Sequence, residues 1–291
     1  MDNTEIIVFY PCDGVSDIQK RQMITQAGKN VKVFGIEGNF DDAQRGVKEI
    51  FGNEIMAREL SEKGYIFSSA NSINWGRLVP QIVYYFSAYI DAVDAGKIAL
   101  GDPINFVVPT GNFGDILAGY YAKLMGLPVD RLLCASNSNN VLTDFINTGT
   151  YDKRREFFKT VSPSMDILVS SNLERLLYDV TGRDAEKVSQ YMRCLNYDGF
   201  YKINAEELKI IQRQFFGAWI DEVETKEAIN RVYNDNGYLM DTHTAVAWRA
   251  LDKYRFLTCD ETYTVVLSTA NPYKFANSVL SALEDKPVSA E

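Results

Sequence analysis

The sequence has few of the residues that build metal centres. It contains a single histidine, His243, and four cysteines in 291 residues, and no two cysteines have the close spacing of a paired metal motif. A metal site is therefore not expected, and His243 is interpreted as a half-buried structural residue. Scattered cysteines of this kind predict free thiols, which are typical of a reducing cytosol.

Positive charge is also scarce. The chain has 30 Lys and Arg against 39 Asp and Glu, which gives a formal net charge of -9. Nucleic acids and anionic membranes are recognised through basic surfaces, so neither is expected as a partner. No apolar run approaches the roughly 20 residues that a membrane helix needs. The first residues also lack the basic and apolar stretches of a secretory signal. We therefore predict a cytoplasmic protein.

Strand-like and helix-like segments alternate through the first hundred residues. The apolar content of 46% and the charged content of 24% are ordinary for a globular protein. Hydrophobic periodicity and capping residues predict strands at 5–10, 31–37 and 65–69, and helices at 16–27, 41–51 and 74–95. This order is typical of a parallel α/β sheet.

Gly, Pro and charged residues cluster between Asp94 and Pro103 and suggest a domain boundary. We expect a small α/β domain over residues 1–98 and a larger α/β domain over 99–291, with a helical insertion at about 138–240. The segments predicted for the larger domain are strands at 105–108, 131–135 and 262–267, and helices at 115–125, 206–218, 244–253 and from 272.

An apolar strand runs directly into Gly111-Asn112-Phe113-Gly114, and a helix is predicted from Asp115. The first N–H groups of a helix lack partners within the helix, and together with the helix dipole they can bind a phosphate. Glycine would allow a positive φ and close approach of an anion. The pattern alone fits an ordinary turn better, and it lacks the features of a Walker loop or a dinucleotide fingerprint. The four residues alone leave both interpretations open.

Seven stretches, in one order along nearly the whole chain, resemble the threonine synthases. These are pyridoxal phosphate (PLP) enzymes of the tryptophan-synthase-β fold type. The stretches are YPCDGVSDIQKRQM (10–23), VFGIEGNFDDAQ (33–44), SANSINWGRLVPQIVYYF (69–86), PTGNFGDILAGYYA (109–122), SPSMDILVSSNLERLLY (162–178), DTHTAVA (241–247) and STANPYKF (268–275). The resemblance implies an α/β protein with two parallel-sheet domains of the fold-type II PLP enzyme kind, incomplete at the N-terminus.

The resemblance also implies a set of cofactor contacts. The residues implied to hold the 5′-phosphate of PLP are Gly111, Asn112, Phe113, Gly114 and Asp115. Thr269 is implied to face the pyridine nitrogen, where a neutral hydroxyl moderates the ring as an electron sink. Without the resemblance, Thr269 fits a helix N-cap better. The chain departs from the family pattern at Asn271, where histidine is usual, and at Thr242, where proline is usual.

Three polar residues, Ser72, Asn74 and Arg77, lie where the long helix of residues 74–95 is expected to begin. Hydroxyl, amide and guanidinium groups at a helix start can bind a carboxylate or a phosphate. We expect Ser72 and Asn74 to contact the substrate, which the resemblance implies to be O-phosphohomoserine. The same residues also fit helix capping. For Arg77, substrate binding and a surface position are equally supported.

The lysine that forms the Schiff base with PLP lies, in the family, in a Phe-Lys-Asp-type segment upstream of every stretch matched here. Neither Lys159 nor Lys274 has its place in the family order. No catalytic residue is therefore assigned. The resemblance implies that the intact protein is a carbon–oxygen lyase of threonine biosynthesis, converting O-phospho-L-homoserine and water to L-threonine and phosphate.

We expect the chain alone to be inactive. The sequence leaves open whether it is a deliberately shortened piece, a truncated reading frame or a natural fragment that works with a separate N-terminal segment. The alternative is a non-catalytic protein that binds PLP or another phosphate ligand without the lysine.

Overall fold

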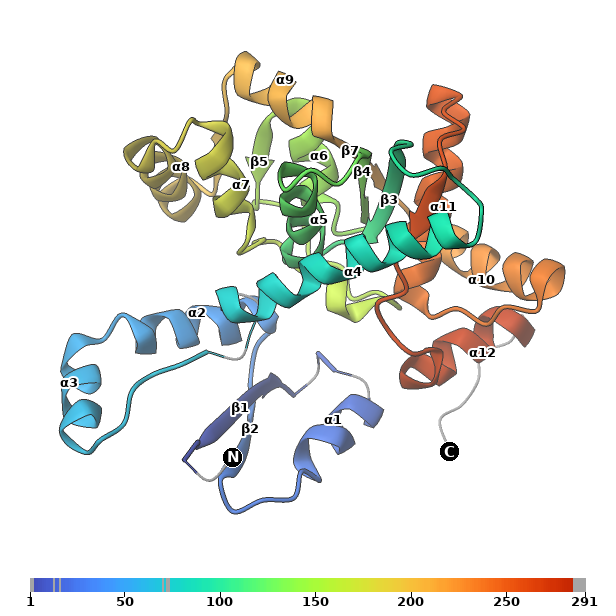
Figure 1. Cartoon of the computed structure of the whole chain (residues 1–291). Coiled ribbons are helices and arrows are strands. Elements are labelled where there is room, and N and C mark those ends of the chain that lie inside the picture. Colours follow the sequence, from blue (N-terminus) through green and yellow to red (C-terminus); the bar gives the residue numbers. More distant parts are fainter. Residues whose placement is uncertain (1–2, 13, 16, 70, 72–73, 285–291) are drawn as a thin grey trace. The chain divides into compact units, whose positions relative to one another are not determined.

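The computed structural model describes residues 3–12, 14, 15, 17–69, 71 and 74–284. The chain divides into two compact units, Met1–Ala70 and Asn71–Glu291 (Figure 1). Each unit has its own parallel sheet. The prediction of parallel-sheet α/β architecture is confirmed.

The first unit is built on two parallel strands. Strand β1 (Ile6–Pro11) pairs with β2 (Val31–Ile36) in an unbroken register of six residues. Its helices are α1 (Asp17–Ile24), α2 (Phe40–Phe51) and α3 (Glu54–Glu62). Asn39 and Asp42 form a reciprocal capping box that starts α2.

The strand predicted at residues 65–69 is wrong. This segment has no regular secondary structure, and Ile66 is 89% exposed. A short apolar run becomes a strand only when a neighbouring strand pairs with it and a core covers it. Helix α3, which is not expected from the sequence, lies just before this segment.

The second unit contains a four-stranded parallel sheet in the order β7-β4-β3-β8. Its strands are β3 (Ile104–Pro109), β4 (Val129–Ser136), β7 (Phe215–Trp219) and β8 (Thr264–Val266). Every residue of β3 is buried, as expected for a central parallel strand covered on both faces.

Alternate residues of the central strands pack on opposite faces of this sheet. Phe106 and Val108 belong to the core formed with α4 (Trp75–Asp94) and α5 (Gly114–Leu124), whereas Val107 packs with α11 (Thr242–Thr258). In Figure 1, α5 and α11 lie on opposite sides of β3 and β4. The carboxyl end of β3 therefore leads into α5 from a strand that is covered on both faces.

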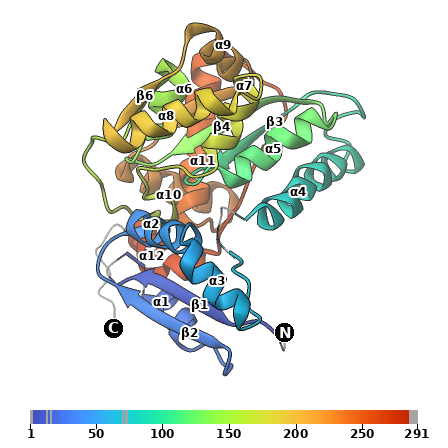
Figure 2. The ribbon, with the colours of Figure 1, turned by 90° about the vertical axis from the view of Figure 1, so that its left-hand side faces the viewer.

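Helix α4 packs against α5, and Figure 2 shows the two side by side. A Cβ added at Gly119 of α5 would lie 2.5 Å from the ring of Tyr85 on α4, so glycine is needed for this close approach. In the described chain α4 thus groups with the second unit, although from the sequence we expect a boundary near residue 98. The domain division of the intact protein stays a prediction.

The stretch 138–240 is not wholly helical. The helix predicted at 206–218 is wrong in its second half, because α9 (Ala205–Gln214) ends where β7 begins and pairs with β4. The other elements after β4 are α6 (Val141–Thr148), β5 (Thr150–Asp152), η1 (Pro163–Met165), α7 (Leu173–Val180), α8 (Ala185–Tyr197), β6 (Phe200–Lys202), α10 (Glu222–Asn236), η2 (Pro272–Phe275) and α12 (Ala276–Glu284). Strands β5 and β6 form a separate antiparallel pair.

In the part of the chain that the structure describes, no helix combines the length and the apolar character needed to cross a membrane. The four cysteines are free thiols, and Cys134 is buried in β4.

Candidate functional site

The loop between β3 and α5 leaves the start of the helix without a side-chain cap. Phe113 is the N-cap of α5, and its side chain is apolar. Its backbone is left-handed, with φ of 60°, which is uncommon for a residue with a Cβ. The ring of Phe113 is buried and lies 5.5 Å from the ring of Phe215, which helps to hold this conformation. The first-turn N–H groups of α5 can therefore serve a ligand.

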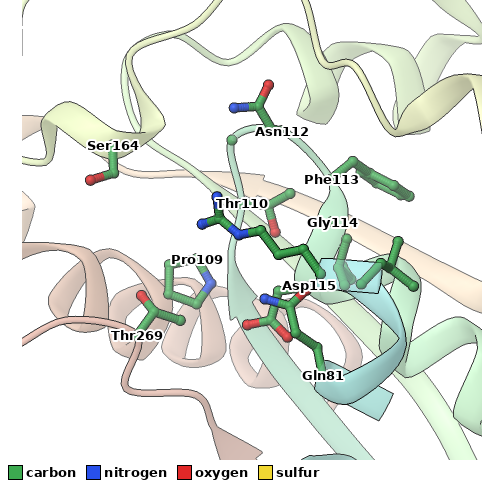
Figure 3. Close-up of a pocket in the computed structure, with 13 residues that line it drawn as sticks. Gln81, Pro109, Thr110, Asn112, Phe113, Gly114, Asp115, Ser164 and Thr269 are labelled. Carbon is green, nitrogen blue, oxygen red and sulfur yellow. The ribbon is translucent and has the colours of Figure 1, made fainter. Parts of the chain in front are cut away.

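A cavity of about 270 Å³ lies at this helix start (Figure 3). It is lined by seven residues predicted from the sequence: Arg77, Gly111, Asn112, Phe113, Gly114, Asp115 and Thr269. The structure thus brings the Gly111–Asp115 loop and Thr269, which are more than 150 residues apart along the chain, to the walls of one cavity.

The other two predicted substrate residues are placed differently. Asn74 is the N-cap of α4, where its Oδ1 accepts a hydrogen bond of 2.8 Å from the N–H of Gly76. It is not among the residues that line the cavity. Ser72 lies outside the described residues. The substrate roles of Ser72, Asn74 and Arg77 stay predictions.

Packing rather than backbone conformation accounts for the two glycines of the loop, and the contact is tighter at Gly111 than at Gly114. Neither Gly111 nor Gly114 has a positive φ, so this part of the sequence-based expectation is wrong. A Cβ on Gly111 would lie 2.8 Å from the carbonyl oxygen of Ser164. A Cβ on Gly114 would lie 3.3 Å from Nδ2 of Asn172. Glycine lets these neighbouring segments approach the loop closely.

Asp115 contributes a carboxyl group next to the loop. The hydroxyl of Tyr85 lies 2.7 Å from the carbonyl oxygen of Asp115 and 3.1 Å from its Oδ1. Burial raises the pKa of Asp115 to about 6, although the hydrogen bond from Tyr85 acts in the opposite direction. The carboxyl is therefore partly protonated in mildly acidic solution.

The single histidine forms a hydrogen bond with Ser164, a residue that lines the cavity. His243 is fully buried rather than half-buried, and its Nδ1 lies 2.9 Å from Oδ1 of Asp241. If Nδ1 donates to this carboxylate, Nε2 accepts, and it lies 3.2 Å from the donating N–H of Ser164. Burial raises the pKa of Asp241, but hydrogen bonds from His243 and Thr244 outweigh burial and hold that pKa below its usual value.

A further hydrogen bond links the same helix start to the segment of Thr269. Thr244 Oγ1 lies 3.2 Å from Oγ of Ser268, the residue before Thr269. Helix α11 thus begins with a polar cluster that connects to two cavity walls, one at Ser164 and one at Thr269. No group of three or more His, Cys, Asp or Glu that could hold a metal ion occurs among the residues described.

Three polar lining residues were not predicted: Gln81, Thr110 and Ser164. Gln81 lies four positions after Arg77 on α4, so helical spacing could have identified it. Thr110 directly precedes Gly111. Ser164 lies in the stretch 162–178 that resembles the threonine synthases, but no local pattern distinguishes it there, because only the fold brings η1 to the loop.

The chain is similar to known proteins over nearly its whole length. A family model described as "Threonine synthase, C-terminal" matches residues 244–291. Human threonine synthase-like 1 is 44% identical over 286 residues, which cover 98% of this chain and 38% of that protein. Threonine synthase of Pseudomonas aeruginosa is 40% identical over 284 residues, which cover 97% of this chain and 57% of that protein.

Solved structures of threonine synthases match the fold. The PLP-bound threonine synthase from Brucella melitensis superposes with a TM-score of 0.83 at 41% identity, covering 97% of this chain and 57% of that chain. Yeast threonine synthase gives a TM-score of 0.82 at 33% identity, covering 98% and 57%. The chain therefore spans between 38% and 57% of the length of these relatives, and over nearly its whole length it is similar to a C-terminal portion of threonine synthases.

Proposed function

We propose that the chain binds pyridoxal phosphate, with the 5′-phosphate at the start of α5. The observation that carries this proposal is a helix N-terminus without a side-chain cap that forms part of the wall of a cavity. The similar structure from Brucella melitensis is described as PLP-bound, which supports the same assignment.

The residues around the cavity fit this cofactor. Main-chain N–H groups of the loop and the positive end of the helix dipole suit a phosphate. Arg77 adds a positive charge to the same cavity. The volume of about 270 Å³ is close to the lower end of the roughly 300–1,000 Å³ range of small-molecule sites. The Thr269 hydroxyl is a neutral partner for the pyridine nitrogen. When bound, PLP supplies an electron sink that stabilises carbanions.

For the complete protein we propose the conversion of O-phospho-L-homoserine and water to L-threonine and phosphate. The support is the similarity to threonine synthases over nearly the whole chain. In this proposal the chain supplies the phosphate site and the substrate contacts of Arg77. A segment outside these 291 residues supplies the catalytic lysine, and the chain alone is inactive.

A second candidate is a protein that binds PLP without catalysis. One observation favours it: no lysine is among the described residues that line the cavity. Both candidates predict reversible binding to this chain. They are separated by assaying the native full-length product with O-phospho-L-homoserine, since only the synthase releases phosphate and threonine.

The cofactor proposal is tested by calorimetric titration of the chain with PLP and with pyridoxal, which lacks the phosphate. We expect PLP to bind at least about tenfold more tightly, because charge-assisted hydrogen bonds to the phosphate contribute roughly 1.5–3 kcal/mol each. Replacement of Arg77 by Ala should reduce this preference. Equal affinity for the two ligands would contradict the proposal.

A further inference from the structure

Three consecutive residues that the cofactor proposal does not use contact the phosphate loop. The Oγ of Ser170 donates to the carbonyl of Gly111 at 2.9 Å. The carbonyl of Asn112 accepts two hydrogen bonds from Asn172, at 3.1 Å from its main-chain N–H and at 3.0 Å from its Nδ2. Between them, Ser171 donates to the side-chain Oδ1 of Asn112 at 3.3 Å. The 170–172 segment thus binds both carbonyls of the loop.

These bonds set the direction of the loop's N–H groups. In a trans peptide the C=O and the following N–H point in opposite directions. When Ser170 holds the Gly111 carbonyl, the N–H of Asn112 points away from Ser170. When Asn172 holds the Asn112 carbonyl, the N–H of Phe113 points away from Asn172. The two anchors thereby fix two successive donors of the loop.

The anchors are themselves held firmly. Ser170 and Asn172 are 5% and 0% exposed, so solvent water is poorly placed to replace them. The N–H of Ser170 donates to the Tyr151 hydroxyl at 2.8 Å, and that hydroxyl donates to the Leu168 carbonyl at 3.0 Å. Arg175 donates to Oδ1 of Asn172, which leaves Nδ2 of Asn172 directed at the loop. A fixed second layer of this kind preorganises a binding site.

We propose that Ser170 and Asn172 are positioning residues that turn the N–H groups of Asn112 and Phe113 toward the phosphate of the ligand. The inference rests on the proposed phosphate site. Without the anchors, the peptide planes of the loop can rotate, and a carbonyl dipole facing the anion repels it. The anchors also act on both peptides that precede the left-handed residue Phe113.

The inference is tested with Ser170→Ala and Asn172→Ala in the 291-residue chain, titrated with inorganic phosphate and with PLP. We expect Ser170→Ala to weaken binding of both ligands about three- to tenfold, the effect of one hydrogen bond. Asn172→Ala should weaken binding less, about threefold, because its main-chain N–H still donates to Asn112. Ser170→Thr keeps the hydroxyl and should restore the affinity.

Amide ¹H–¹⁵N spectra supply a readout that a purely structural role would not change. In the wild-type chain, inorganic phosphate should shift the amide signals of Asn112 and Phe113, and Ser170→Ala should reduce the shift of Asn112. Thr143→Val is the control, because it removes another buried hydroxyl that is bonded to Ser136 at 3.0 Å and not to the carbonyls of the loop. It should leave phosphate affinity unchanged.

The outcomes separate the two proposals. If neither phosphate nor PLP shifts these amides in the wild-type chain, the proposed phosphate site is wrong. If the wild type responds but folded Ser170→Ala and Asn172→Ala bind both ligands with wild-type affinity, only the positioning role is wrong. If Ser170→Ala does not fold, Asn172→Ala decides, and its wild-type affinity would overturn the inference.

Discussion

Asp115 is expected to make the stability of this protein depend on pH in an unusual direction. Burial raises the pKa of Asp115 from 3.8 to about 6 in the folded chain. A shift of about 2 pKa units, at 1.36 kcal/mol per unit, corresponds to about 3 kcal/mol. Because the folded pKa lies above the unfolded pKa, this cost is absent below pH 3.8, grows between pH 3.8 and 6, and is fully present above pH 6.

The Asp115→Asn variant removes this charge with little change in shape. Its amide oxygen can still accept the hydrogen bond from Tyr85, which lies 3.1 Å from Oδ1 in the wild type. We expect the free energy of unfolding of Asp115→Asn to exceed that of the wild type by about 3 kcal/mol at pH 8, and by about half of that at pH 5.

Urea unfolding followed by tryptophan fluorescence at pH 5 and pH 8 measures both differences. The exposed residue Asp130 provides a matched control, because Asp130→Asn should change stability by less than about 0.5 kcal/mol at either pH. A stability difference between Asp115→Asn and wild type that is the same at both pH values would refute the reasoning.

Further predictions concern the walls of the cavity. Gly111→Ala places a Cβ 2.8 Å from the Ser164 carbonyl and should weaken PLP binding by more than about tenfold in a titration, whereas Gly46→Ala, which has open space around its Cβ, should bind normally. Normal binding by Gly111→Ala would contradict the close packing. His243→Ala removes partners of Asp241 and of the Ser164 N–H and should lower the free energy of unfolding by about 2–4 kcal/mol in urea. A loss below about 1 kcal/mol would show that this network is unimportant.

Because the pKa of Asp241 is low, the stability lost in His243→Ala should depend on pH. A carboxyl whose folded pKa lies below its unfolded value stabilises the fold above the unfolded pKa, and this stability is lost as the pH falls through the folded pKa. The penalty of His243→Ala, measured by urea unfolding, should therefore become smaller as the pH falls below about 4. A penalty that grows with acidification would contradict this assignment.

The centre of the site could be predicted from the sequence because its signals are local. The buried strand β3, the glycine-containing turn and the helix from Gly114 follow one another directly, and each has its own pattern. The positive φ could not be assigned correctly, because the residue that adopts it is Phe113 and burial of its ring helps to hold it there.

The supporting residues could not be predicted in the same way. Ser164 and Ser170 reach the loop only because the fold returns the chain to it some 50 to 60 residues later. Strand β7 cannot be recognised from the sequence, because Phe215–Trp219 is a short apolar run directly after a helix. Only its pairing with β4 distinguishes it from a further helical turn. Such contacts depend on tertiary structure, which overrides local propensity.

The central claim is that the start of α5 holds the phosphate of PLP, and a crystal structure of the chain with PLP tests it most directly. The account predicts phosphate oxygens about 2.7–3.2 Å from main-chain nitrogens of the loop Gly111–Asp115. It also predicts that the pyridine ring extends toward Thr269. A phosphate bound elsewhere on the chain, or bound without contact to these main-chain nitrogens, would contradict it.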